Sequence, residues 1–306
     1  MFIPNPDPYL LPAYNISPFM TNYIIENSEL AEDDFAVGYF DGRFGRENWK
    51  YTFNGREAIE LALEHYKLQK DDLVTILTTS GNLYISSCVT GTIEKFCRWN
   101  RELLPETKLI FVNHEFGYPY TEMDRLVATG LPIIEDCCTT FFSQDEKQMV
   151  GKYGDFTVYS FPKFFPIRLG GLLVSNKGIT TSGSLSLTGE QKDFVQKVIS
   201  HHIRGEKELL DKRKHNFEYA IAKFSGLGFE LRFPCNELAY PSVLLLKNKG
   251  IVNDLNALKA FLTARGIQNS VFYGEDAFFI PCHQSLSEID IDLIFQTIVY
   301  YLDEKI

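Results

Sequence analysis

The sequence predicts an α/β protein in which short strands alternate with helices around a parallel or mixed sheet. Short apolar runs of strand length recur between residues 73 and 174, and segments with apolar residues at helical spacing separate them. This alternation is typical of crossover connections between parallel strands. We therefore expect a large α/β unit that contains most of the first two hundred residues.

The first regular helix of this unit is expected to begin sharply at Gly55. Residues 55–63 place apolar side chains at helical spacing, Asn54 precedes them as a candidate N-cap, and Glu57 lies in the first turn. The amide groups at a helix N-terminus favour anions, so this helix start is a candidate anion site. Residues 1–50 show no sustained period, and we expect them to form an arm or an irregular cap.

The next elements follow from apolar runs and their separators. Strands are expected at residues 73–77, 108–113, 131–135 and 156–161, with helices at 86–99 and 121–129. Gly170 and Gly171 indicate a turn into a further strand. The last two strands therefore frame a loop that contains Lys163.

A different pattern begins near Gln191. We expect a long polar helix that continues to Phe224, and we interpret its basic cluster, Lys212 to Lys214, as a solvated face. A strand at 243–247, a helix at 252–265, a turn at 280–283 and a closing helix at 288–301 follow. These elements predict an N-terminal arm and large domain over residues 1–205, and a small α+β domain over residues 206–306.

Composition excludes several classes of function. The net charge of -10, with acidic and basic residues mixed along the sequence, argues against a nucleic-acid partner, because binding a phosphate backbone needs a basic face. The chain begins without the basic and apolar regions of a signal peptide and has no stretch of membrane-spanning length, so we expect a cytoplasmic protein with no membrane partner. The cysteines lack C-x-x-C spacing, and we expect them to be reduced and mostly buried. The pair His201-His202 is too isolated for a zinc site, so no metal is expected.

Asp136 and Lys163 are the candidate chemical residues. Asp136 ends an apolar run, and the carboxyl ends of strands face the ligand crevice of an α/β sheet; its position alone leaves a helix N-cap or a loop acid equally open. Lys163 lies among Phe161, Pro162, Phe164, Phe165 and Pro166. Apolar surroundings favour the neutral amine that Schiff-base formation requires. Most lysines are merely solvated, so this interpretation also stays open.

The two residues and the helix start at Gly55 suit one cofactor in combination. Pyridoxal phosphate (PLP) needs a lysine, an acid for its pyridine nitrogen and amide groups for its phosphate. Lys163, Asp136 and residues 55–57 supply one of each. By itself this constellation is a weak signal.

Several motifs in order resemble the DegT/StrS family of sugar aminotransferases, which have the aspartate-aminotransferase-like (fold-type I) architecture. The resemblance covers most of the chain. The motifs are Gly55-Arg56-Glu57-Ala58, KLIFVNHEFGYP at 108–119, LPIIEDCC at 131–138, GDFTVYSF at 154–161, Lys163 with Gly170-Gly171, and PCHQSLSEID at 281–290.

The resemblance implies a PLP-transferase-like large domain with three α/β/α layers and a mixed, mainly parallel sheet. It makes Lys163 the Schiff-base lysine and Asp136 the partner of the pyridine nitrogen. It also implies that Gly55, Arg56 and Glu57 give amides to the phosphate and that Ser160 lies near it. Family members are homodimers with the active site at the interface.

The activity implied by the resemblance is PLP-dependent transamination of a keto-sugar nucleotide to an amino sugar, for surface polysaccharide or a related glycoside, with glutamate as amine donor. Two rival hypotheses remain. Thr139 stands where the family usually has His or Gln, and the chain is shorter than typical members; both features motivate a binding or regulatory protein without turnover. A PLP-dependent sugar dehydratase or lyase on the same scaffold is the other.

Overall fold

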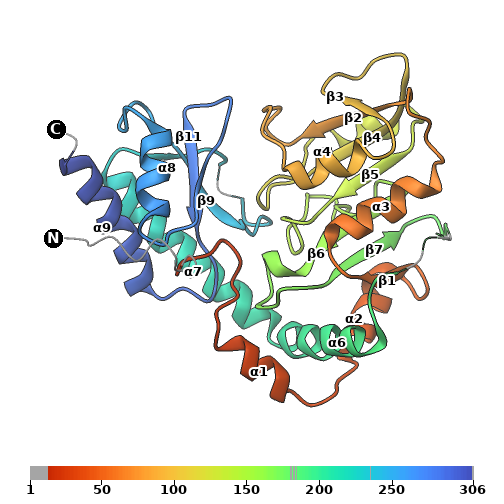
Figure 1. The fold of residues 1–306 in the computed structure, drawn as a ribbon, viewed down its shortest axis with the longest axis horizontal. Coiled ribbons are helices and arrows are strands. Elements are labelled where there is room, and N and C mark those ends of the chain that lie inside the picture. Colours follow the sequence, from red (N-terminus) through yellow and green to blue (C-terminus); the bar gives the residue numbers. More distant parts are fainter. Residues whose placement is uncertain (1–12, 180, 182, 184, 235, 305–306) are drawn as a thin grey trace.

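The computed structural model describes residues 13–304 except 180, 182, 184 and 235. Cys235 and the start of the predicted arm, residues 1–12, lie outside the described residues. Within the described chain, two separate sheets lie side by side (Figure 1), a large one built from residues before 176 and a small one built from residues after 229.

The large sheet has seven strands in the order β1-β7-β6-β5-β4-β2-β3. Neighbours from β6 through β5, β4 and β2 to β3 are parallel, whereas β7 is antiparallel to both β6 and β1. The prediction of a mixed, mainly parallel sheet is confirmed. The strands are β1 (Trp49–Thr52), β2 (Leu73–Thr78), β3 (Arg98–Asn100), β4 (Thr107–Asn113), β5 (Ile133–Asp136), β6 (Phe156–Ser160) and β7 (Gly171–Ser175).

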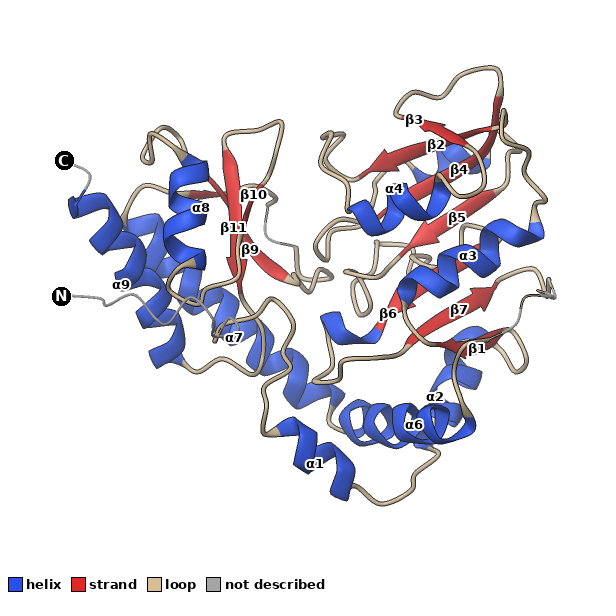
Figure 2. Cartoon of the chain, viewed as in Figure 1, coloured by secondary structure: helices blue, strands red, loops and turns tan. Residues whose placement is uncertain are grey.

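Helices cover both faces of the large sheet, which gives three layers (Figure 2). Strand side chains alternate between the faces. Phe156 and Val158 pack with α3 (Gly55–His65) and α4 (Ser87–Ile93). On the other face, Tyr159 packs with α2 (Phe35–Phe44) and α6 (Gly189–Arg204), and Ile110 packs with α5 (Met123–Val127). The predicted three-layer α/β/α architecture is therefore confirmed.

The expectation of an irregular first fifty residues is wrong for part of that segment. Two helices form there, α1 (Tyr23–Glu29) and α2. Two glycines make α2 a poor helix by intrinsic propensity, but its Phe40 is fully buried and stacks on Phe161, with Trp49 edge-on. Tertiary packing stabilises this helix, and sequence periodicity does not reveal such contacts.

Two predicted helix boundaries are also wrong. The helix expected at 86–99 ends at Ile93, and residues 98–100 form the edge strand β3 beside β2. Residues 98–100 leave the helical pattern because they pair with Leu73, Val74 and Thr75 of β2, a tertiary contact that helical spacing in the sequence does not reveal. The long helix expected from Gln191 to Phe224 is broken at Gly205 into α6 and α7 (Glu206–Gly226).

The small sheet is antiparallel, in the order β10-β11-β9-β8. Helices α7, α8 and α9 pack on one face and form its main core. The turn expected at 280–283 is partly wrong, because Ile280 and Pro281 pair with β9 as the end of a strand. The further elements are β8 (Glu230–Leu231), β9 (Val243–Lys247), α8 (Leu255–Thr263), β10 (Ser270–Val271), β11 (Ala277–Pro281) and α9 (Glu288–Glu304).

Helix α7 connects the large unit, built on the seven-stranded sheet, with the small unit, built on the four-stranded sheet. Leu209 near its start packs into the core of the large sheet, and Phe217 packs into the core of the small sheet. The solvated face expected at Lys212 to Lys214 is wrong for Arg213, which is only 1% exposed. The division of the chain at residue 205 stays a prediction. None of the described helices is both long and apolar enough to cross a bilayer.

Candidate active site

A cleft of about 470 Å³ lies where the two sheets face each other. The arrowheads of β2 and β5 point toward the small sheet in Figure 2, so the carboxyl ends of the parallel strands form one wall. The small sheet forms the other wall with Val243 and Phe279. Five of the six predicted site residues line the cleft: Gly55, Arg56, Asp136, Ser160 and Lys163.

Asp136 is the last residue of β5 and is 3% exposed. Its Oδ2 accepts a hydrogen bond of 2.8 Å from Asn113 Nδ2, and its Oδ1 accepts one of 2.9 Å from the Cys138 amide. Burial raises the pKa of this carboxyl, although both hydrogen bonds favour the ionised form. No ion pair to Asp136 occurs among the described side chains. A cation bound in the cleft next to Asp136 would therefore supply the positive counter-charge that the ionised carboxylate has no side chain to provide.

Lys163 ends the short 3-10 helix η1 (Phe161–Lys163), directly after β6. The aromatic neighbours Phe161, Phe164 and Phe165 are fully buried in the core beneath the loop. These three rings pack beneath the loop and support its backbone. Lys163 itself is half-buried, and it is the one lysine among the described residues that line the cleft.

The start of α3 forms the part of the cleft nearest Ser160. Asn54 caps the helix by accepting the Glu57 amide at 3.0 Å, as predicted from the sequence. The amides of Gly55 and Arg56 precede the first intrahelical bonds and are available to an anion. A Cβ at position 55 would lie 2.8 Å from Cys138 Sγ and 3.2 Å from Ser160 Cβ. Glycine at position 55 therefore allows Cys138 and Ser160 to pack closely against the start of α3.

Glu57 is the predicted site residue that does not line the cleft. Its amide donates to Asn54, and its carboxylate accepts the amides of Phe53 and Ser186 at 2.6 Å each. These bonds hold the start of α3 against the segment after β7. Glu57 thus organises the helix terminus, and Gly55 and Arg56 are left as the candidate anion donors.

Other residues of the cleft were not identified from the sequence. Asn113 ends β4 next to Asp136, and the strand-end argument that found Asp136 would also have found it. No sequence signal indicates Cys88, which accepts a hydrogen bond of 3.0 Å from Arg56. This bond is the main cause that lowers the pKa of the Cys88 thiol. A thiol in this setting is more reactive than a buried one.

Thr139 and Tyr84 also lie in the cleft wall. The Thr139 hydroxyl donates to His114 O at 3.0 Å and accepts the Phe116 amide at 2.9 Å. It thereby fixes the loop after β4, so its presence in place of His or Gln has a structural explanation. The Tyr84 ring packs against Phe272 of the small unit, with the centroids 5.4 Å apart.

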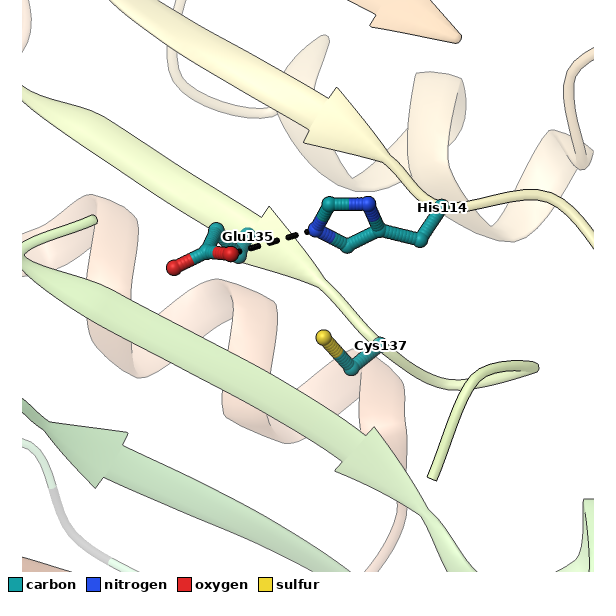
Figure 3. A group of neighbouring side chains, drawn as sticks. All are labelled: His114, Glu135 and Cys137. Carbon is teal, nitrogen blue, oxygen red and sulfur yellow. Dashed lines mark hydrogen bonds and ion pairs between the residues drawn. The ribbon is translucent and has the colours of Figure 1, made fainter. Parts of the chain in front are cut away.

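A second group of polar side chains, His114, Glu135 and Cys137, is fully buried on the other face of β5 (Figure 3). His114 Nε2 lies 3.2 Å from Glu135 Oε2, and its Nδ1 accepts the Tyr120 amide. Glu135 also accepts the amides of Gly151 and Gly154. Burial raises the pKa of the Cys137 thiol well above its usual value, which disfavours the metal-binding thiolate. The group therefore serves as a buried hydrogen-bond network.

Comparison with known proteins relates the sequence and the fold of this chain to aminotransferases. Residues 98–288 match the model of the DegT/DnrJ/EryC1/StrS aminotransferase family. GDP-perosamine synthase of Escherichia coli O157:H7 is 24% identical over 213 residues, which are 60% of this chain and 57% of that protein. UDP-N-acetyl-3-dehydro-alpha-D-glucosamine 3-aminotransferase of Acidithiobacillus ferrooxidans is 27% identical over 268 residues, 76% of this chain and 70% of that protein. The match to the first relative thus spans less than two thirds of its length.

Solved structures share the fold over nearly the whole chain. The aminotransferase TlmJ from Streptoalloteichus hindustanus superposes with a TM-score of 0.73 at 17% identity and covers 93% of this chain and 97% of its own. Spr1654 from Streptococcus pneumoniae, solved in a PLP form, gives a TM-score of 0.71 at 16% identity and covers 99% and 100%. At these identities the likeness concerns the fold alone.

Proposed function

We propose that this chain, which belongs to the DegT/DnrJ/EryC1/StrS aminotransferase family, is a PLP-dependent aminotransferase. Its substrate would be a keto-sugar nucleotide and its amine donor glutamate. The observation that carries the proposal is the presence of Lys163, Asp136 and the start of α3 in one cleft. The names of two relatives, a GDP-perosamine synthase and a UDP-sugar aminotransferase, support the nucleotide-sugar class.

The residues of the cleft fit the cofactor. When bound, PLP supplies an electron sink for chemistry at the carbon that bears the amine. Asp136 would hold the pyridine nitrogen, because it is a buried acid without a cationic side chain beside it. The amides of Gly55 and Arg56 would hold the phosphate together with Ser160, whose Cβ is close to Gly55.

Lys163 would have two roles at its Nζ atom. It is first the nucleophile that attaches the cofactor, since no other described lysine lines the cleft. Released from that bond, the same amine is placed to remove a proton from the substrate carbon and to return one, which is general base and acid catalysis. The homodimer, the cytoplasmic location and the domain division at residue 205 are part of the proposal.

Lys163→Ala tests the assignment. We expect wild-type protein supplied with PLP to show the absorbance of a lysine Schiff base, and borohydride to fix the label on Lys163. Lys163→Ala should lose both the absorbance and glutamate-dependent turnover. The matched control is Lys177→Ala, which removes a lysine that is 66% exposed and paired with Asp155.

The product identifies the reaction class. Amino-sugar formation from a keto-sugar nucleotide, with conversion of glutamate, supports transamination. Loss of water without amine transfer would assign a dehydratase instead. Retention of the Schiff-base absorbance in Lys163→Ala would overturn the site assignment.

A further inference from the structure

The backbone of the lysine loop, residues 163–166, is held by three side chains from distant parts of the chain. Arg213 of α7 donates to Lys163 O at 3.4 Å, Gln284 donates to Phe164 O at 2.7 Å, and Asn27 of α1 donates to Pro166 O at 2.8 Å. The carbonyl of the candidate nucleophile and that of its neighbour therefore both depend on the pair Arg213 and Gln284.

Arg213 is an unusual residue for a helix interior. Its guanidinium is buried, and its acceptors are the neutral oxygens of Pro241, Gln284 and Lys163. No described carboxylate pairs with it, and its Nε has no hydrogen-bond partner among the described residues. Burial lowers the pKa of Arg213 to about 10. A buried charge without a counter-charge is costly to stability, so overall stability does not explain this residue.

Gln284 links Arg213 to the lysine loop through hydrogen bonds at both ends of its side-chain amide. Its Oε1 accepts a hydrogen bond of 2.6 Å from Arg213, and its Nε2 donates to Phe164 O. Both ends of the amide are engaged, so it cannot rotate without losing both bonds. The Arg213 guanidinium also lies over the Phe164 ring, 4.6 Å from the centroid. Two independent contacts thus fix the residue that follows Lys163.

We propose that Arg213 and Gln284 are positioning residues for Lys163. They fix the backbone at residues 163 and 164, and through it the direction in which the Lys163 amine enters the cleft relative to Asp136. The proposal rests on the proposed function of Lys163 as the cofactor lysine. It adds that the connecting helix α7 and the segment before α9, which carry Arg213 and Gln284, set the reactivity of that amine.

Asn216 provides a matched control on the same helix. It lies three residues after Arg213, is 1% exposed, and donates to His283 O at 2.9 Å and Leu286 O at 2.8 Å. It therefore joins α7 to the segment that contains Gln284, and neither of these two hydrogen bonds reaches the lysine loop. Asn216→Ala should weaken the packing of this region without redirecting Lys163.

The experiment measures covalent labelling of Lys163 in cofactor-free protein. The variants Gln284→Glu, Gln284→Met and Arg213→Lys are treated with PLP and cyanoborohydride over a pH series, and labelling is located by peptide mass spectrometry. Gln284→Glu keeps an acceptor for Arg213 but places an oxygen against Phe164 O. The free energy of unfolding is measured in parallel, so that a folding defect is recognised separately.

We expect the Gln284 variants and Arg213→Lys to label Lys163 roughly tenfold to a hundredfold more slowly, because small displacements of a reacting group have effects of this size. The pH midpoint of labelling should also move, whereas Asn216→Ala keeps the wild-type rate and midpoint. Folded Gln284 variants that label within twofold of the wild-type rate at the same midpoint would overturn the positioning role. Failure of the wild type to label at Lys163 would instead overturn the proposed function.

Discussion

At the scale of single residues, the environment of Asp136 matters most for the chemistry of the cleft. Desolvation raises the pKa of its carboxyl, and the amides of Cys138 and Asn113 only partly oppose this effect. The ionised form is therefore costly until a cation lies beside it. A pyridine nitrogen that holds a proton is such a cation.

This environment predicts a pH-dependent stability in the cofactor-free protein. The folded pKa of Asp136 lies above the unfolded value of about 3.9, so the folded state binds the proton more tightly. Stability is consequently lost as pH rises through the folded pKa. Asp136→Asn cannot ionise, so the free energy of unfolding of the wild type should fall relative to this variant as the pH rises above about 4, the unfolded pKa, in urea titrations. A difference that stays constant or grows with pH would contradict the prediction.

At the scale of elements, α3 illustrates how one local motif can serve both folding and binding. Asn54 caps this helix at the edge of the cleft, and Asp254 caps α8 far from it by accepting the amides of Asn256 and Ala257. Both caps satisfy backbone donors that would otherwise lack partners. Only the first orients amides toward the candidate phosphate site.

Replacing each N-cap residue with alanine distinguishes the contribution of the cap to folding from its contribution to cofactor binding. Asn54→Ala and Asp254→Ala should each lower the free energy of unfolding by about 1 kcal/mol. Only Asn54→Ala should also weaken PLP binding, by roughly threefold to tenfold, because the helix terminus loses its fixed orientation toward an anion. Absorbance titration with PLP checks this. Equal PLP affinity in the two variants would show that α3 does not bind the phosphate.

At the scale of the whole molecule, a polar contact joins the small unit to the loop after β2. Glu275 accepts bonds from both Nε and Nη2 of Arg232, and it accepts a bond of 3.0 Å from Asn82 Nδ2. Asn82 Oδ1 in turn accepts the amide of Tyr84, at 2.7 Å, in the cleft wall. Burial raises the pKa of Glu275, but its bonds to Arg232 and Asn82 outweigh this and keep the pKa below its usual value.

Removal of this contact should weaken the binding of the sugar substrate more than the binding of the cofactor. Glu275→Ala should lower the free energy of unfolding by about 1–3 kcal/mol, since hydrogen bonds to charged groups are lost. It should raise the KM for the sugar substrate with little change in PLP affinity, because Asn82, which accepts the Tyr84 amide in the cleft wall, loses its partner Glu275, whereas Asp136 and the start of α3 keep their partners. Lys249→Ala, in the turn after β9, is the control, because its exposed ion pair with Glu230 contributes little. A fall in PLP affinity as large as the rise in KM would contradict this division.

The sequence by itself determined the features that depend on local physics. Strand and helix alternation predicted the fold class, the N-cap Asn54 predicted where α3 begins, and the strand-end rule placed Asp136 at the cleft. Lys163 was found from its loop between two strands and from the family motifs. Each of these signals depends on residues close together in the chain or on their order.

The tertiary structure decided what depends on distant contacts. α2 forms because Phe40 meets Phe161, and the burial of Arg213 requires Pro241 and Gln284, which lie 28 and 71 residues away. Such contacts leave no period or cap in the sequence, because burial is fixed only when the elements pack. For the same reason the sequence could name Lys163, but only the fold could indicate which residues hold it in place.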